Sequence, residues 1–290
     1  MTDRAALVSH ARVSIAKGSR SFALASKLFD RTTRERAWLL YSWCRTCDDI
    51  ADGQDHGGAL TTVEDPQERL AYLRSMTERA LAGEVTGEPA FDALGLVVKE
   101  SAIPQAWPRD LIEGFAMDAD AFSPITTEDL LIYCYHVAGV VGLMMAVIMG
   151  VSPRDKDTLA HANDLGLAFQ LANIARDVRE DAEGGRCYIP ADWLTEFGIS
   201  ASPFSDQEQA GLGRVGARLA KMAGEYEASA RIGAERLSFR SRWAVLAAAG
   251  IYGDIARKVG QRGAAAWDTR VVTSGAGKAT WVAKALMQAV

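Results

Sequence analysis

The stretch LGLAFQLANIARDVRED, from Leu165 to Asp181, decides which fold the sequence predicts. Its polar side chains Gln170, Asn173, Asp177 and Asp181 stand at positions i, i+3, i+7 and i+11, so on an α-helix they form one stripe. The rest of the stretch is too apolar for a surface helix. We therefore expect a buried helix with one polar face that lines a cavity. The amides of this face lie deep in the cavity, and its carboxylates lie at the cavity mouth. The side assigned to the core carries Leu165, Phe169, Ala172 and Ala175.

A second acidic cluster, DDIAD, contains Asp48 and Asp52 with the same spacing of four as Asp177 and Asp181. Like charges one helical turn apart destabilise a helix by a few tenths of a kcal/mol, and a helix C-terminus also disfavours negative charge. A divalent cation would reverse both effects. Mg²⁺ takes one or two carboxylates together with phosphate oxygens and water. The two pairs therefore predict a Mg²⁺ site that clamps a diphosphate, with Mn²⁺ as the alternative ion, although either pair alone could be a solvated helix end.

Several arginines are candidates for binding phosphate oxygens. They are Arg20, Arg45, Arg176 and Arg186, and Arg186 lies in a loop with paired glycines that could move over a bound ligand. For each arginine alone, a surface ion pair is the competing interpretation.

Helical patterns with short breaks at proline and glycine cover nearly the whole chain. No Gly/Ser-rich linker divides it, so we expect one all-α domain over residues 1–290. The predicted helices span residues 3–17, 32–52, 66–82, 88–101, 108–120, 127–150, 154–182, 206–233, 238–260 and 278–289.

Composition restricts the functional classes. The net charge of −5 argues against a general nucleic-acid surface, which needs a basic face. Four cysteines in 290 residues do not make a disulfide scaffold and fit a reducing cytoplasm. The N-terminal residues lack the apolar core of a secretion signal. We therefore expect a cytoplasmic protein.

The run from Leu130 to Val151 is apolar except for His136 and is long enough for a bilayer, which needs about 20 residues. Acidic neighbours and the lack of a basic flank favour a helix buried at the centre of the protein instead. A hydrogen-bonded core role is expected for His136. Gly139 and Gly142 could give apolar ligands a close wall or let two helices pack closely, and the sequence leaves both possibilities open.

Two further patterns are set aside. Residues 211–216 fit GxGxxG literally, but no strand precedes them, so a dinucleotide site is not expected. Cys44 and Cys47 form a CxxC pair with no second pair in the chain, so we expect buried thiols rather than zinc or redox chemistry.

The chain resembles the squalene and phytoene synthases from about Ser14 to Ala266. The resemblance implies an all-α fold of the isoprenoid synthase type with a central cavity. The matching motifs are GSRSFALASKLF (18–29), LYSWCRTCDDIAD (40–52), EGFAMD (113–118), YCYHVAGVVGLMM (133–145) and FQLANIARDVREDAEGGRCYIP (169–190).

The resemblance also implies an activity, most closely that of the family members that make a C40 product at the start of carotenoid synthesis. Two geranylgeranyl diphosphates would condense head to head through a cyclopropyl diphosphate, with loss of both diphosphates and without NADPH. Metal ions would be bound by the two aspartate pairs, with Asn173 beside them. Tyr41 and Arg45 would share the catalytic role with the aspartates. The implied substrate contacts are Ser21, Phe22, Tyr41, Arg45, Gln170, Asn173, Arg176 and Tyr252.

Two other functions stay open at this stage. A C30 relative would act on farnesyl diphosphate, and a helical assembly factor would have lost catalysis, although both aspartate pairs are intact here. No obligate protein partner and no nucleic acid are expected. Because the substrates and the product are apolar, we expect reversible contact with a membrane surface.

Overall fold

The computed structural model describes residues 3–53, 65–200, 204–205 and 208–290. Within these residues the chain forms helices and loops and no strand, so the predicted all-α class is confirmed. The elements are α1 (Arg4–Gly18), α2 (Arg20–Ser26), α3 (Arg31–Asp52), α4 (Pro66–Leu81), α5 (Pro89–Ser101), α6 (Ala106–Ala119), α7 (Thr127–Cys134), a π-helical turn (Tyr135–Gly139), α8 (Val140–Ile148), α9 (Lys156–Glu183), α10 (Ala191–Phe197), α11 (Gln209–Ala234), α12 (Phe239–Arg262), a 3₁₀ turn (Gly263–Trp267) and α13 (Gly275–Ala289).

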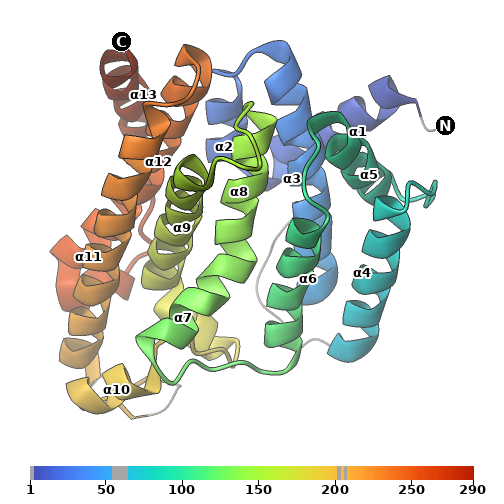
Figure 1. The fold of residues 1–290 in the computed structure, drawn as a ribbon. Helices are drawn as coiled ribbons and strands as arrows, with labels where there is room; N and C mark the ends of the chain where they lie inside the picture. Colours follow the sequence, from blue (N-terminus) through green and yellow to red (C-terminus); the bar gives the residue numbers. More distant parts are fainter. Residues whose placement is uncertain (1–2, 54–64, 201–203, 206–207) are drawn as a thin grey trace.

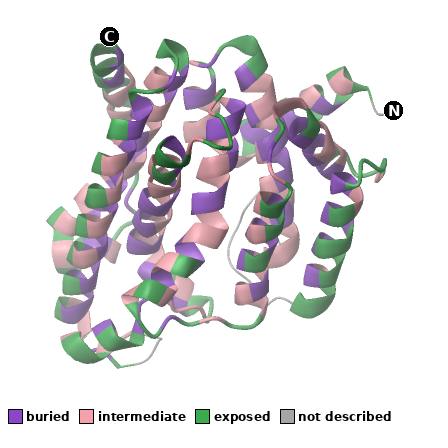
Figure 2. Cartoon of the chain, in the orientation of Figure 1, coloured by how far each residue is buried: buried purple, intermediate pink, exposed green. Residues whose placement is uncertain are grey.

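The central helix is α9, which is packed against α11, α12 and α8 (Figure 1). The long helices run side by side, and each carries buried residues, the purple segments of Figure 2, along its length. The C-terminal ends of α3 and α9 both lie toward the lower end of Figure 1. This arrangement brings two segments that are far apart in the sequence to the same end of the bundle.

Local capping fixes where the two helices that carry the acidic pairs begin. Asp30 accepts a hydrogen bond from the Thr33 backbone N at 3.0 Å at the start of α3. Asp155 caps α9 in the same way, accepting from the Thr158 backbone N at 3.1 Å. Each such cap stabilises a helix by about 1 kcal/mol. At its other end, α3 stops at Gly53, whose left-handed φ of 65° suits glycine.

The apolar run is a central helix, interrupted by the π-helical turn instead of continuous over 127–150 as predicted. Its span Thr127–Ile148 passes a length and composition test for a membrane helix, and 44% of the most apolar window is buried. Several of its incompletely buried side chains, Val137, Val141 and Met145 among them, line an internal cavity. Much of the incomplete burial therefore comes from the cavity, while Ile132, which does not line it, is exposed on the surface.

Glycine lets α8 and α9 approach closely. A Cβ atom on Gly142 would lie 2.2 Å from the Ala162 carbonyl oxygen, and one on Gly139 would lie 2.3 Å from Asn163 Oδ1. Helix packing therefore accounts for both glycines, and Gly142 also lines the cavity.

The predicted helix limits otherwise agree with the structure to within a few residues. The prediction missed α2 and α10, each of which has 7 residues, too few to show a helical repeat. The GxGxxG pattern lies inside α11, where a Cβ on Gly213 would meet the Ala264 backbone N at 2.8 Å. A Cβ on Gly211 or Gly216 would likewise lie within 3.1 Å of a neighbouring side chain, so close packing accounts for these glycines.

Candidate active site

Two connected cavities occupy the centre of the bundle. The first, of about 570 Å³, is the apolar chamber, whose walls come from α2, α3, α8, α9, α11 and α12. The second, of about 740 Å³, is the polar mouth at the C-terminal ends of α3 and α9. Arg45, Asp48, Gln170, Asn173 and Arg176 line both, so one space leads from the charged mouth into the chamber.

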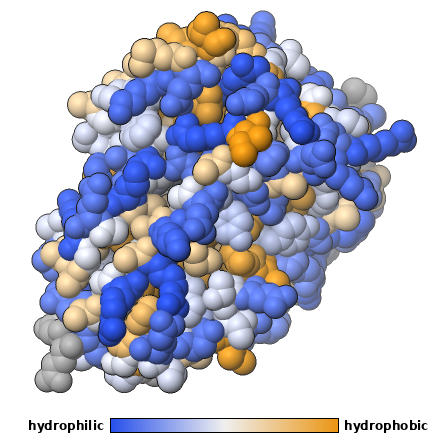
Figure 3. Space-filling view, turned by 60° about the vertical axis from the view of Figure 1, so that its left-hand side comes forward, coloured by the Kyte–Doolittle hydropathy of each residue, from blue (hydrophilic) through white to orange (hydrophobic). Residues whose placement is uncertain are grey.

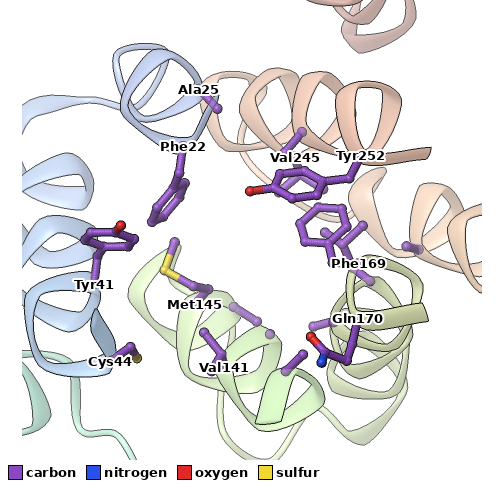
Figure 4. Close-up of a pocket in the computed structure, with 18 of the residues that line it drawn as sticks. Phe22, Ala25, Tyr41, Cys44, Val141, Met145, Phe169, Gln170, Val245 and Tyr252 are labelled. Carbon is purple, nitrogen blue, oxygen red and sulfur yellow. The ribbon is translucent and has the colours of Figure 1, made fainter. Parts of the chain in front are cut away.

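Aromatic and apolar side chains point into the chamber in Figure 4. Phe22 and Tyr41 stand on one side with ring centroids 5.6 Å apart. Phe169 and Tyr252 stack on the other side at 4.3 Å. The assignment of Phe169 and Leu165 to the core side of α9 was wrong, because both line the chamber. Phe169 lies four positions before Asn173, and that spacing puts the two on the same helix face.

The first aspartate pair lies in the last two turns of α3. Arg45 donates to Asp48 Oδ2 at 3.0 Å, and Arg186 reaches across from the loop after α9 to donate to Asp52 Oδ1 at 2.6 Å. The Asp48 side chain keeps 49% of its surface open because it faces the mouth rather than packed protein. Desolvation, followed by the charge of Asp52, raises the pKa of Asp48 to about 7.

The second pair lies on the opposite wall, at the end of α9. Asp177 accepts from Arg176 Nε at 2.7 Å and from Arg270 at 2.9 Å. Arg270 also pairs with Glu180. Desolvation and the neighbouring Asp177 raise the pKa of Asp181 to about 7. The mouth therefore holds carboxylates whose mutual repulsion is only partly balanced by arginines.

A partly buried carboxylate that lines the mouth together with the two pairs was not predicted as a site residue. Asp118, near the end of α6, accepts hydrogen bonds from the hydroxyls of Tyr188 at 2.8 Å and Tyr133 at 3.1 Å. Burial raises its pKa to about 6, against the lowering effect of Arg186. The sequence did carry a signal, since Asp118 ends the EGFAMD motif and Tyr133 begins YCYHVAGVVGLMM, but neither motif revealed a role. Arg270 lies beyond the resembling region and gave no signal.

Nearly all predicted site residues meet in this one space. Ser21, Phe22, Tyr41 and Tyr252 line the chamber, and Asp52, Asp177, Asp181 and Arg186 line the mouth. The remaining predicted residue, Arg20, is the first residue of α2, and its side chain lies outside the described part of the structure.

The patterns that were set aside behave as expected. His136 Nδ1 lies 2.8 Å from the Asp110 carbonyl oxygen, a core hydrogen bond. Cys47 is a buried free thiol, and Cys44 is a free thiol on the chamber wall.

The donor set of the mouth fits a magnesium ion. Among the described residues, no three His, Cys, Asp or Glu side chains converge as a complete metal cage. The carboxylates instead stand in pairs on two walls, with space between them. That arrangement suits Mg²⁺, which takes few protein ligands and fills its octahedron with phosphate oxygens and water. Desolvation, followed by a neighbouring carboxylate, raises the pKa of both Asp48 and Asp181, and a bound cation would offset both effects.

An all-α bundle around an apolar chamber, with an aspartate pair on each wall of its mouth, is the isoprenoid synthase fold. The sequence profile of the squalene/phytoene synthase family matches residues 15–276. The chain belongs to the squalene/phytoene synthase family.

Individual relatives agree with this assignment. The chain is 46% identical over 287 residues to a 15-cis-phytoene synthase of Pantoea ananas, covering 98% of this chain and 92% of that protein. It is 48% identical to one from Enterobacter agglomerans, covering 94% and 92%. Among solved structures, a dehydrosqualene synthase with bound ligand superposes with a TM-score of 0.83 at 28% identity, covering 97% of this chain and 96% of the other. A squalene synthase from Alicyclobacillus acidocaldarius shares the fold, with a TM-score of 0.76 at 24% identity and coverage of 90% and 95%.

Proposed function

We propose that this chain is a prenyl transferase that joins two geranylgeranyl diphosphates head to head. The product is phytoene, formed through a cyclopropyl diphosphate (prephytoene diphosphate) with release of two diphosphates, at the committed step of carotenoid synthesis. The observation that carries the proposal is the continuous space from an acidic, arginine-lined mouth into an apolar chamber. A molecule with a diphosphate head and a long apolar tail matches both parts at once.

The mouth would hold the diphosphate heads. The aspartate pairs, with Asn173 beside the second, would bind Mg²⁺, and the ions would supply the positive charge that stabilises a departing diphosphate. Arg45, Arg176 and Arg186 already lie among these carboxylates and would bind phosphate oxygens once the carboxylates are engaged by metal. The side chains would thus exchange partners on ligand binding without large movement.

The chamber would protect the carbocation that remains when the first diphosphate leaves. Tyr41, Phe22, Phe169 and Tyr252 line the space, and aromatic ring faces can stabilise positive charge without capturing it. The apolar walls exclude water, which would otherwise quench the cation to an alcohol. The double bond of the second substrate attacks the cation, and loss of a proton closes the cyclopropane ring of the diphosphate intermediate. Loss of the second diphosphate, rearrangement and loss of a second proton then give the central double bond.

Finer features of the reaction are part of the proposal. Mg²⁺ is the expected ion, with Mn²⁺ able to replace it, and no NADPH is needed because the product is not reduced. We propose 15-cis geometry because the relatives from Pantoea ananas and Enterobacter agglomerans carry that name. The dehydrosqualene synthase similarity keeps farnesyl diphosphate as the substrate to test against.

We also propose that residues 1–290 act as one domain, since the chamber takes wall residues from α2 through to α12. The protein would work in the cytoplasm without an obligate protein partner and without nucleic acid. It would contact membranes reversibly, because its substrates and product are lipids.

The experiment is a product assay on the purified chain with geranylgeranyl diphosphate and Mg²⁺, without NADPH. We expect a C40 hydrocarbon and two diphosphates for each product, both abolished by EDTA. Asp48→Asn and Asp177→Asn should each lower turnover at least about a hundredfold, the scale on which removal of a charge-stabilising group acts. Asp157→Asn, on an exposed part of α9, is the matched control and should keep full turnover. Unchanged turnover in Asp48→Asn and Asp177→Asn would refute the proposed metal sites.

A further inference from the structure

The end of the molecule opposite the mouth has an exposed apolar patch. Ile232 is 58% exposed, Phe239 46% and Met287 74%, although these residues belong to three different helices. Two hydrogen bonds hold the helices together there, from Arg231 to Gln288 Oε1 at 2.9 Å and from Arg242 to the Ala289 carbonyl at 3.3 Å. Figure 3 shows apolar side chains gathered at the upper end of the molecule, where Figure 1 places the C-terminal end of α13.

Basic side chains surround this patch. The turn from Arg231 to Arg242 contains four arginines, of which Arg231 pairs with Glu227 and Arg236 lies beside Asp155 and Asp157. The helix α13 adds Lys278 and Lys284 and contains no acidic residue. Within the described residues, the hydrogen bonds of Arg240 and Arg242 end on backbone carbonyls, so no carboxylate neutralises these two charges. Lys284 is exposed and lies over the Trp281 ring at 4.8 Å. This end of a chain with a net charge of −5 therefore carries three cations, Arg240, Arg242 and Lys284, that no described carboxylate neutralises.

The same turn between α11 and α12 also closes the apolar chamber from inside. Gly233, Ala234 and Leu237 line the chamber, while their neighbours Ile232 and Phe239 face outward. The patch therefore covers the end of the chamber farthest from the mouth. The mouth itself is rich in carboxylates. The unneutralised cations beside this patch and the carboxylates of the mouth thus lie at opposite ends of the molecule.

We propose that this positive apolar end, made of Ile232, Phe239, Arg240, Arg242, Lys284, Leu286 and Met287, docks on the surface of an anionic lipid bilayer. The apolar side chains enter the headgroup boundary, and the basic side chains bind the negative surface. The acidic mouth then points away from the membrane toward water, where the released diphosphates and metal ions are soluble. This inference rests on the proposed peripheral membrane contact and specifies its surface and orientation.

Charge complementarity selects this surface over a second exposed apolar site. Ile125 and Ile132 are also exposed, at the mouth end, but they flank Glu128 and Asp129. An anionic bilayer would repel that site. It therefore provides the matched control: the same kind of side chain, exposed to a similar degree, in an acidic environment.

The test is flotation of the full chain with vesicles of phosphatidylcholine alone or mixed with phosphatidylglycerol. We expect binding to the anionic vesicles that weakens with salt. Arg240→Gln with Lys284→Gln should lower the partition coefficient about fivefold for each residue. The double variant Phe239→Ser with Met287→Ser should have a lower partition coefficient than the charge variant. The control double variant, Ile125→Ser with Ile132→Ser, should bind like the parent chain. Thermal melts of each variant identify any loss of folding, and Met287→Ser alone is the least intrusive substitution.

Three results would overturn the inference. The first is that the parent chain does not float with the vesicles, and the second is that the charge and apolar variants bind as strongly as the parent chain. The third result is a dimer that these variants dissociate while vesicle binding stays unchanged. The last result would mean that a second copy of the chain covers the patch. Product formation from geranylgeranyl diphosphate in detergent is measured on the same samples. Intact turnover without flotation would refute the docking surface and leave the proposed reaction standing.

Discussion

At the scale of single residues, Asp118 connects three parts of the mouth. Its carboxylate accepts from Tyr133 and Tyr188, and its charge acts on Arg186. We propose that it is a positioning residue that sets the place of Arg186 and of the two hydroxyls. Asp118→Asn keeps the side-chain shape but loses the charge, so we expect turnover to fall about tenfold, corresponding to about 1.4 kcal/mol, with a smaller change in melting temperature. Tyr188→Phe should lose less turnover. A turnover in Asp118→Asn equal to that of the parent chain would refute the proposed positioning role.

The raised pKa values of Asp48 and Asp181, both about 7, predict how metal and pH act together. In the metal-free protein the folded state holds these protons more tightly than the unfolded chain does. Its stability therefore falls as pH rises from about 4, the ordinary carboxyl pKa, toward 7. Mg²⁺ competes with the protons, so its stabilising effect should grow over the same range. Melting temperatures with and without Mg²⁺ at pH 5.5 and pH 8 test this, and an equal increase at both values would contradict it.

At the scale of elements, the contact between α8 and α9 depends on Gly142. A methyl group there would lie 2.2 Å from the Ala162 carbonyl, so Gly142→Ala should separate the helices and destabilise the protein by about 1–3 kcal/mol. Gly224 is the matched control, a helical glycine in α11 where an added methyl group would meet nothing within 4 Å. Gly224→Ala should stabilise by about 0.5–1 kcal/mol. Urea unfolding of both variants measures the change in free energy of unfolding. Equal changes would show that the close approach of α8 to α9 at Gly142 does not determine stability.

Patterns that repeat within one helix predicted the site best. The stripe on α9 and the matching pair on α3 are local spacings, and both led to the same cavity. Roles that depend on contact between distant segments could not be predicted in this way. Asp118 and Tyr188 are 70 positions apart, and Arg270 meets Glu180 across 90. Phe169 was assigned to the core because apolar character alone does not distinguish a packed wall from a cavity wall.

At the scale of the whole molecule, the bundle separates charge from apolar space along one axis. The acidic mouth lies at the C-terminal ends of α3 and α9, and the chamber extends from it toward the α11–α12 turn. That polarity suits two substrate molecules in one space, each with a charged head and one long apolar tail. The chamber has to accept C20 tails for the proposed product, and chamber length is the property that separates this proposal from a C30 synthase.

The most direct measurement is therefore competition between the two substrates. The chain is given equal amounts of geranylgeranyl diphosphate and farnesyl diphosphate with Mg²⁺ and without NADPH, and the extracted hydrocarbons are identified by mass spectrometry. We predict that the C40 hydrocarbon dominates and that EDTA abolishes it. A C30 hydrocarbon as the main product would contradict the proposed substrate, and the absence of any hydrocarbon would contradict the proposed reaction.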